Sequence, residues 1–153
     1  DGPTLNKKVR DILPNTKTIF ISGYAEDTFR QDLDSSEQIH FLPKPFSLKD
    51  LASKVKALII TLGAQGSIIY TDGKQIEIPC VESKEIVDPT GCGDAYRAGL
   101  LYGIANNMDW QTTGQLGSLI GAIKIAHRGG QNHHFSRDEI DQRYFEKFGN
   151  RIF

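Results

Sequence analysis

The sequence has little cysteine, no excess of either charge and no long apolar run. Its two cysteines, Cys80 and Cys92, belong to no C-x-x-C pair, so we expect reduced thiols without a metal or redox role. The 18 Lys and Arg residues against 19 Asp and Glu residues exclude the basic surface that nucleic acid or an anionic membrane requires. Because no stretch resembles a membrane span or a signal peptide, we expect a soluble, cytoplasmic protein.

Repeats, low-complexity tracts and a histidine cluster are also missing. The adjacent His133 and His134 point apart on most backbones, and His40 and His127 are distant in sequence, so solvated or core imidazoles are favoured over a metal site. A chain of 153 residues fits one domain and buries about 70% of its unfolded surface without disulfides. The first residue is Asp1 rather than Met, from which we expect processing or removal of a tag.

One stretch combines tight-turn glycines, a helix start and a carboxylate, namely DPTGCGDAYRAG over residues 88–99. Residues 91–93 precede an apolar periodic run, so their N–H groups are expected at a helix N-terminus, where they can face an anion. Asp94 falls in that first turn and can act as the general base for a hydroxyl that attacks a phosphoryl group. From the residues alone, a capped helix whose carboxylate favours the dipole remains the alternative. The periodic run comprises Ala95, Ala98 and Tyr102.

This stretch resembles the phosphoryl-transfer signature of the ribokinase-like (PfkB) family of sugar and nucleoside kinases. The resemblance implies that Asp94 is the catalytic base and that the backbone amides of Gly91, Cys92 and Gly93 form an anion hole. Cys92 stands where many members of the family carry Ala, and this difference leaves the backbone amide intact.

Two further segments resemble elements of the same family, in the same order along the chain. TLGAQGS, residues 61–67, is similar to a strand and turn whose glycines, here Gly63 and Gly66, lie against ATP in the family. A later segment resembles an element near the adenine and an activating monovalent cation, and its matching residues are Arg128, Gly130 and Gln131. Together the three matches imply an ATP site in the part of the chain that follows residue 57.

Periodicity and capping residues in the first 57 residues predict alternating helices and strands. The expected elements are a helix through Leu5, Val9 and Ile12, a strand at 17–22, a helix at about 25–33, a strand at 39–42, and a helix that opens at a Ser47–Asp50 capping box and carries Leu48, Leu51 and Val55. Such alternation favours a parallel sheet covered by helices.

The same 57 residues resemble the back half of a two-component receiver domain of the kind found in hybrid histidine kinases. The resemblance implies that Ser22 is the switch hydroxyl, Lys44 the phosphate-contacting lysine and Phe41 the switch aromatic. The acidic metal-binding pair and the phospho-acceptor Asp of a receiver have no counterpart in this chain, so we expect no phospho-relay. A strand-end hydroxyl and a surface cation are the favoured interpretation of Ser22 and Lys44.

The second part of the chain, residues 58–153, predicts three strands followed by three helices. The expected elements are a buried strand at 58–62, a hairpin of 67–71 and 74–78 around Asp72-Gly73, a helix at about 90–105, a helix capped by Asp109, and a last helix from the Ser136–Glu139 capping box to about Phe148. The middle helix has an apolar face of Leu116, Leu119, Ile120 and Ile123, with Gly114, Gly117 and Gly121 allowing close helix approach. Tyr144, Phe145 and Phe148 are the expected anchors of the last helix.

These patterns predict an α/β fold, a three-layer α/β/α sandwich of Rossmann or flavodoxin-like type with a mostly parallel sheet extended by an antiparallel hairpin. The abrupt join near residues 56–58 suggests a splice between a receiver-like half, 1–57, and a ribokinase-like half, 58–153. We expect the two halves to fold together as one composite domain, because each half alone leaves apolar surface uncovered. An unpaired strand edge could then recruit a second copy of the chain.

We interpret the chain as an engineered chimera with no complete active site and no native function, because receiver-like sequence replaces the substrate-binding half of a kinase. A general base contributes about 10²–10⁴-fold, whereas positioning both reactants supplies roughly 7–11 kcal/mol. We therefore expect no kinase turnover and no required cofactor or metal, but weak binding of ATP, phosphate or sulfate at residues 91–94. The alternatives are an ATP-dependent sugar or nucleoside kinase of the PfkB family and a residual anion-binding module.

Overall fold

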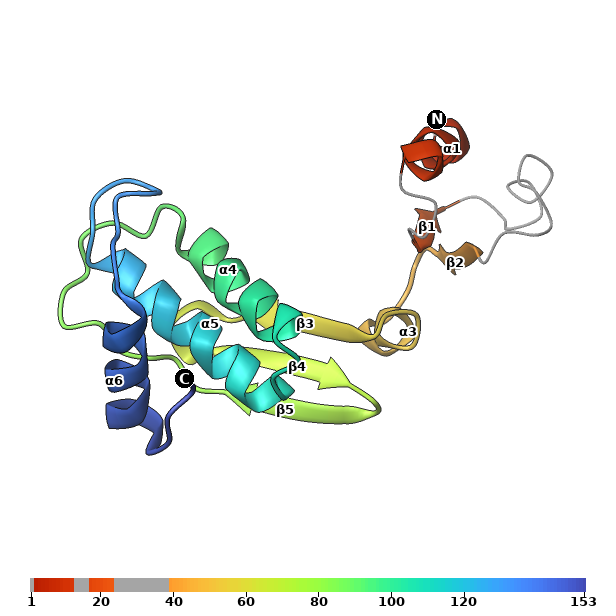
Figure 1. Cartoon of the computed structure of the whole chain (residues 1–153). Coiled ribbons are helices and arrows are strands. Elements are labelled where there is room, and N and C mark those ends of the chain that lie inside the picture. The colour runs from red at the N-terminus through yellow and green to blue at the C-terminus, as the bar shows by residue number, and fades with distance from the viewer. Residues whose placement is uncertain (1, 13–16, 24–38) are drawn as a thin grey trace. The chain divides into compact units, whose positions relative to one another are not determined.

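The computed structural model describes residues 2–12, 17–23 and 39–153 (Figure 1). The chain divides into two compact units, Asp1–Leu58 and Ile59–Phe153, and each is described by itself. The helix expected at 25–33 lies outside the described residues.

The first unit contains helix α1 (Gly2–Ile12), strands β1 (Thr18–Ser22) and β2 (Ile39–Pro43), and helix α3 (Leu48–Ala52). The two strands pair in parallel with Phe20 opposite Phe41, so both predicted strands are confirmed. Phe20 and Leu42 are buried, and the Thr18 hydroxyl donates to Oδ1 of the buried Asn6 at 2.6 Å. This hydrogen bond fastens α1 to β1.

Helix α3 is shorter than the sequence pattern predicts. The Ser47–Asp50 capping box is present, with the Asp50 amide donating to the Ser47 hydroxyl at 3.2 Å. The helix nevertheless ends at Ala52, before Val55, and the Ser53 hydroxyl donates to the carbonyl of Asp50 at 2.7 Å. A serine that bonds the preceding turn competes with helix propagation. Residues 53–56 then form an ordinary loop before the next strand, so the join is not abrupt.

The second unit is built on a sheet in the order β3-β4-β5, from β3 (Ala57–Thr61), β4 (Ser67–Thr71) and β5 (Lys74–Ile78). Strands β4 and β5 are antiparallel, as predicted, and Thr71 pairs with Lys74 across the turn. Asp72 and Gly73 have φ values of +47° and +72°, which is the backbone of a two-residue type I′ turn. The described strands thus lie in two sheets, and the mostly parallel three-layer sandwich stays a prediction.

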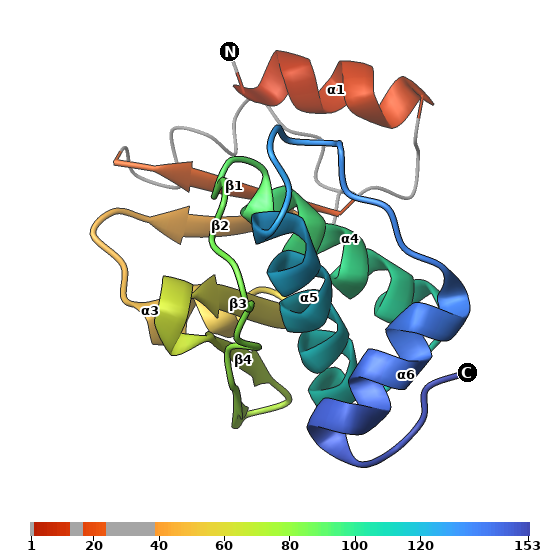
Figure 2. The same ribbon diagram turned by 90° about the vertical axis from the view of Figure 1, so that its left-hand side faces the viewer.

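Three helices follow the hairpin, α4 (Cys92–Ala105), α5 (Trp110–Ile125) and α6 (Arg137–Phe148). Helix α5 packs against both α4 and α6 (Figure 2). It also contacts β4 and β5. The two predicted caps are confirmed, because the Asp109 carboxylate accepts from the Thr112 amide at 2.9 Å and the Ser136 hydroxyl accepts from the Glu139 amide at 3.1 Å. Helix α5 is therefore the central helix of this unit.

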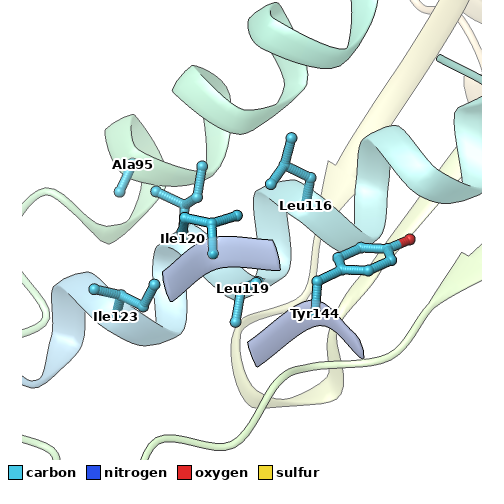
Figure 3. Close-up of a cluster of buried hydrophobic side chains, with 7 residues drawn as sticks. Ala95, Leu116, Leu119, Ile120, Ile123 and Tyr144 are labelled. Atoms are coloured by element: carbon cyan, nitrogen blue, oxygen red, sulfur yellow. The ribbon is translucent and has the colours of Figure 1, made fainter. Parts of the chain in front are cut away.

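The core of the second unit lies between these helices (Figure 3). All four apolar residues predicted on the face of α5 are buried, and they pack with Ala95 of α4 and with Ile140 and Tyr144 of α6. Phe145 does not serve as an anchor, because it is 43% exposed and its ring centroid lies 5.1 Å from the guanidinium carbon of Arg151. The residues of α5 in this core are Leu116, Leu119, Ile120 and Ile123.

Helices α4 and α5 approach each other through glycine. A Cβ added to Gly99 would lie 2.6 Å from the Cα of Gly117, so neither helix has room for a side chain at this crossing. The periodic run predicted for α4 is wrong in part, since Ala98 and Tyr102 are exposed. Glycines carry little apolar character, and their share of the buried face was therefore invisible in the hydrophobic pattern. The buried face of α4 comprises Ala95, Tyr96, Gly99, Leu100 and Gly103.

Candidate functional site

The candidate site is the turn that leads into α4, residues 88–94, which we name the anion turn. Gly91 is the N-cap of α4 and has a φ of +83°, a left-handed conformation that glycine adopts without strain. A Cβ at Gly91 would lie 2.9 Å from the carbonyl oxygen of Gly130, in the turn that follows α5. Gly91 thus permits both the backbone shape of the anion turn and the contact of this turn with the loop that follows α5.

The carboxylate of Asp88 ties the two loops together. It accepts hydrogen bonds from the amide of Gly129 at 2.8 Å and from the amide of Thr90 at 2.9 Å. These hydrogen bonds lower the pKa of Asp88 to about 2, and the bond from Gly129 contributes most. Asp88 is therefore negatively charged at neutral pH, and its carboxylate accepts hydrogen bonds from the backbone of both loops.

Asp94 lies in the first turn of α4, the position that the sequence predicts for a general base. Its side chain is 75% exposed and pairs with the guanidinium of Arg97, one turn further along, at 3.2 Å. An exposed carboxylate at a helix N-terminus is accessible to a substrate hydroxyl. The role of Asp94 as a base stays a prediction.

The three amides expected to form the anion hole differ in their surroundings. The Cys92 amide donates to the carbonyl of Pro89 at 3.1 Å, so an anion would share this donor with the turn. The thiol of Cys92 is half-buried, and burial raises its pKa, which favours the inert thiol that the sequence predicts. Gly91 and Gly93 flank it at the helix start, where the dipole favours an anion.

Lys124, near the end of α5, is a residue of this site that sequence reasoning missed. Its side chain is completely buried, and its ammonium donates to the carbonyl of Asp88 at 2.7 Å and to the carbonyl of His127 at 2.9 Å. The signal was present in the sequence, because Lys124 follows Ile120 by one helical turn and so falls on the apolar face. A lysine on such a face requires a buried partner.

The two glycines expected near ATP lie in the turn between β3 and β4. Gly63 opens a short 3₁₀ helix (Gly63–Gln65) with a φ of +59°, and Gly66 closes it with a φ of +93°. A side chain at Gly66 would collide with the carbonyl oxygen of Ile78, and the Gly66 carbonyl accepts from the Leu62 amide at 2.8 Å. These contacts explain the glycines by backbone shape, and their role at ATP stays a prediction.

The segment after α5 brings Gly129 and Gly130 to the anion turn but leaves the side chain of Arg128 exposed. His127 is held by its ring Nδ1, which lies 2.9 Å from the carbonyl of Ile123. Among residues 2–12, 17–23 and 39–153, no three His, Cys, Asp or Glu side chains are grouped to hold a metal ion. Within the same ranges, no helix has the length and apolar character of a membrane span.

In the first unit, the structure brings together the residues of the receiver resemblance. Ser22 ends β1 and pairs with Pro43, and the amide of Lys44 donates to the carbonyl of Ser22 at 2.8 Å. Phe41 is half-buried in β2, while the side chain of Lys44 is exposed. Their roles as switch residues and phosphate contact stay predictions.

Comparison with known proteins finds extensive similarity to nucleoside kinases. The chain is 38% identical over 98 residues to a nucleoside kinase of Methanocaldococcus jannaschii, which covers 64% of this chain and 32% of that protein. The structure of the Burkholderia thailandensis nucleoside kinase in complex with ADP-inosine matches with a TM-score of 0.69 and 41% identity, over 88% of this chain and 39% of that one. Its complex with inosine gives a TM-score of 0.68 and 50% identity, over 69% and 35% of the two chains. The chain spans about a third of the length of these relatives.

A second kind of relative matches a shorter stretch. The sensor kinase CckA of Brucella abortus is 52% identical over 59 residues, which cover 39% of this chain and 6% of that protein. This match is compatible with a receiver-like segment, and the chimera itself is unconfirmed.

The expectation that the chain is not an enzyme is wrong. The nucleoside kinase of Burkholderia thailandensis, matched at 50% identity in its complex with inosine and at 41% in its complex with ADP-inosine, points to a kinase.

A family model matches most of the chain. The profile of the pfkB family carbohydrate kinases matches residues 3–136, which include most of the first unit as well as the anion turn. The structural neighbours share an α/β fold with the chain, and they include the nucleoside kinase of Methanocaldococcus jannaschii as a member of the ribokinase family. The chain therefore belongs to the pfkB family of carbohydrate kinases.

Proposed function

We propose that the chain is an ATP-dependent kinase that transfers a phosphoryl group to a hydroxyl of a nucleoside or a related sugar. The observation that carries this proposal is the match of 88% of the chain to a nucleoside kinase in complex with ADP-inosine. The anion turn supports it independently, because a glycine turn, a helix N-terminus and an exposed carboxylate lie within seven residues, 88–94.

In the proposed reaction, the exposed carboxylate of Asp94 accepts the proton of the acceptor hydroxyl. The hydroxyl oxygen forms a bond to the γ-phosphorus of ATP while the bond from that phosphorus to the bridging oxygen breaks, and ADP leaves. Asp94 then releases the proton to solvent. The substrate ATP supplies the phosphoryl group.

The anion turn is proposed to stabilise the negative charge of the transferring phosphoryl group. Phosphoryl transfer is catalysed chiefly by positioning and electrostatic stabilisation. The start of α4 supplies backbone donors at Gly91 and Gly93 and the positive end of the helix dipole. The Asp88 bonds to Thr90 and Gly129 hold this backbone in place before substrate arrives.

A coupled assay of ADP formation tests the proposal on the full chain, with inosine, adenosine and ribose as acceptors. Asp94→Asn is expected to lower turnover by about 10²–10⁴-fold, the contribution of a general base. Asp138→Asn is the matched control, because Asp138 is also an exposed carboxylate in the first turn of a helix, α6. Acceptor-dependent ADP formation that is equal in Asp94→Asn and the control would contradict the assigned base, and no ADP formation with any acceptor would contradict the kinase.

We further propose that the match to the sensor kinase falls on the first unit and reflects a receiver-derived segment joined to the kinase unit, in one three-layer α/β/α fold. The length of that match, 59 residues, supports this origin. The family match from residue 3 onward favours an uninterrupted kinase instead. Recovery of a single natural gene with this sequence would contradict an engineered join.

A further inference from the structure

The buried ammonium of Lys124 is a costly feature that the proposed reaction does not yet use. Transfer of a charged group from water into the protein interior is unfavourable unless partners compensate it. Lys124 has no exposed surface, and its hydrogen bonds run to the neutral carbonyls of Asp88 and His127. These neutral acceptors satisfy two of its three donors, and its positive charge acts on the Asp88 carboxylate and would stabilise a further anion nearby.

The hydrogen bonds of Lys124 show that its ammonium lies next to the backbone of the anion turn. Asp88 is the first residue of the turn, and its carbonyl receives the 2.7 Å bond. The sulfur of Cys92, the first residue of α4, lies 4.0 Å from the same carbonyl oxygen. The backbone of Cys92 in turn contacts α5, because a Cβ at Gly121 would lie 3.7 Å from the Cys92 carbonyl. Lys124 therefore lies on the α5 side of the turn.

The positive charge of Lys124 acts on two residues of the anion turn, Asp88 and Cys92. Burial raises the pKa of the Cys92 thiol, and the positive charge of Lys124 opposes that rise. Hydrogen bonds from Gly129 and Thr90 chiefly lower the pKa of Asp88, and the charge of Lys124 adds to them. In both cases a negative charge at the turn is favoured by the buried ammonium, which is the sign required for binding phosphate.

We propose that Lys124 is a positioning residue of the anion turn, whose buried ammonium holds the Asp88 and His127 carbonyls together and adds positive charge for a bound phosphate. This inference rests on the proposed function, because it assigns the phosphates of the nucleotide to the turn. A lysine with only a structural role would support folding and would affect all ligands alike. A lysine that acts through its charge affects ligands in proportion to their negative charge.

The test compares Lys124→Met with the unaltered chain by titration with MgATP, ADP, AMP and adenosine. Methionine keeps much of the side-chain volume and removes the charge and the donors. The Kd of MgATP is expected to rise about tenfold, as for the loss of one charged interaction. The Kd of AMP should rise less and that of adenosine should stay unchanged. Lys147→Met, an exposed lysine in the last turn of α6, is the matched control with the same change in net charge.

The outcomes separate this inference from the proposed function. Equal rises for all four ligands, or no rise, would overturn the role of Lys124 alone. A chain that binds the phosphates with the expected gradation but transfers none of them would contradict the kinase and leave the role of Lys124 supported. A chain that binds no phosphate ligand would overturn both.

A second variant keeps the inference testable if Lys124→Met does not fold. Lys124→Ala removes three methylene groups and the ammonium, which together correspond to a propylammonium ion. Added propylammonium should restore MgATP binding and the thermal transition, whereas 1-propanol, which has the same length and no charge, should restore neither. Equal restoration by both compounds, or by neither, would overturn the role of the charge.

Discussion

Substitution of Gly99 by Ala should destabilise the protein through the contact between α4 and α5. A Cβ at this position would lie 2.6 Å from the Cα of Gly117 and 2.8 Å from its backbone nitrogen. Carbon atoms in good contact are about 3.5–4.0 Å apart, so the helices would have to separate by roughly 1 Å. Because both colliding atoms belong to the backbone, no side-chain rotation can relieve the overlap.

The expected loss of stability in Gly99→Ala is the difference between two opposing effects. Overpacking of a close-packed core costs about 1–3 kcal/mol, and a backbone collision belongs at the upper end of that range. Alanine in place of glycine in a helix interior contributes about 1 kcal/mol of stabilisation. The net loss is therefore about 2 kcal/mol, which corresponds to a fall in Tm of about 4–8 °C for a chain of this size.

Thermal denaturation followed by circular dichroism measures this difference. Gly121→Ala is the matched control, because Gly121 lies in α5 and its added Cβ meets nothing closer than the Cys92 carbonyl at 3.7 Å. The control is expected to gain up to about 1 kcal/mol from helix propensity. A Gly99→Ala variant that melts at or above the temperature of the Gly121→Ala variant would refute the reasoning.

Three further predictions concern hydrogen bonds at element ends. Gly129 and the other donors lower the pKa of Asp88 to about 2. The stabilising contribution of the Asp88 carboxylate is therefore complete above its ordinary pKa of 3.8 and is lost as pH falls toward 2. Acid titration of Asp88→Asn should show a weaker pH dependence of stability between about pH 4 and 2 than the unaltered chain. Asp141→Asn should release the last residues, because the Asp141 carboxylate accepts from the Ile152 amide at 2.8 Å; amide hydrogen exchange at Ile152 should accelerate, and unchanged exchange would contradict this role. Ser136→Ala should lower the free energy of unfolding by about 1 kcal/mol through loss of the α6 cap, whereas Ser136→Asp, which keeps a capping oxygen, should lose far less in the same urea titration.

Local sequence signals predicted the elements that local chemistry determines. The Asp72-Gly73 turn fixed the register of the β4–β5 hairpin, because its two positive φ values suit these residues. The caps at Asp109 and Ser136 marked the starts of α5 and α6 correctly, since each side chain satisfies an amide within its own first turn. In these cases, the deciding interaction spans only a few residues.

Features that depend on distant partners were not predictable in the same way. The sequence predicted close helix approach at Gly117, which is confirmed, but it did not reveal that the partner is Gly99 of α4. The loop bonds of Asp88 reach Gly129, 41 positions away, and Lys124 reaches back to Asp88 over 36 positions. The sequence placed Asp94 in the first turn of α4 and Lys124 on the apolar face of α5, but it did not reveal that Lys124 bonds to the carbonyl of Asp88.

The central helix also provides an internal reporter of motion. Trp110, the single tryptophan, opens α5, and Lys124 lies near its other end, at a distance of about 21 Å for a rise of 1.5 Å per residue. A nucleotide that only neutralises the charge at Lys124 would leave the fluorescence of Trp110 unchanged at that distance. A nucleotide that shifts α5 as a rigid rod would alter the emission of Trp110, so one spectrum distinguishes a local electrostatic response from movement of the whole helix.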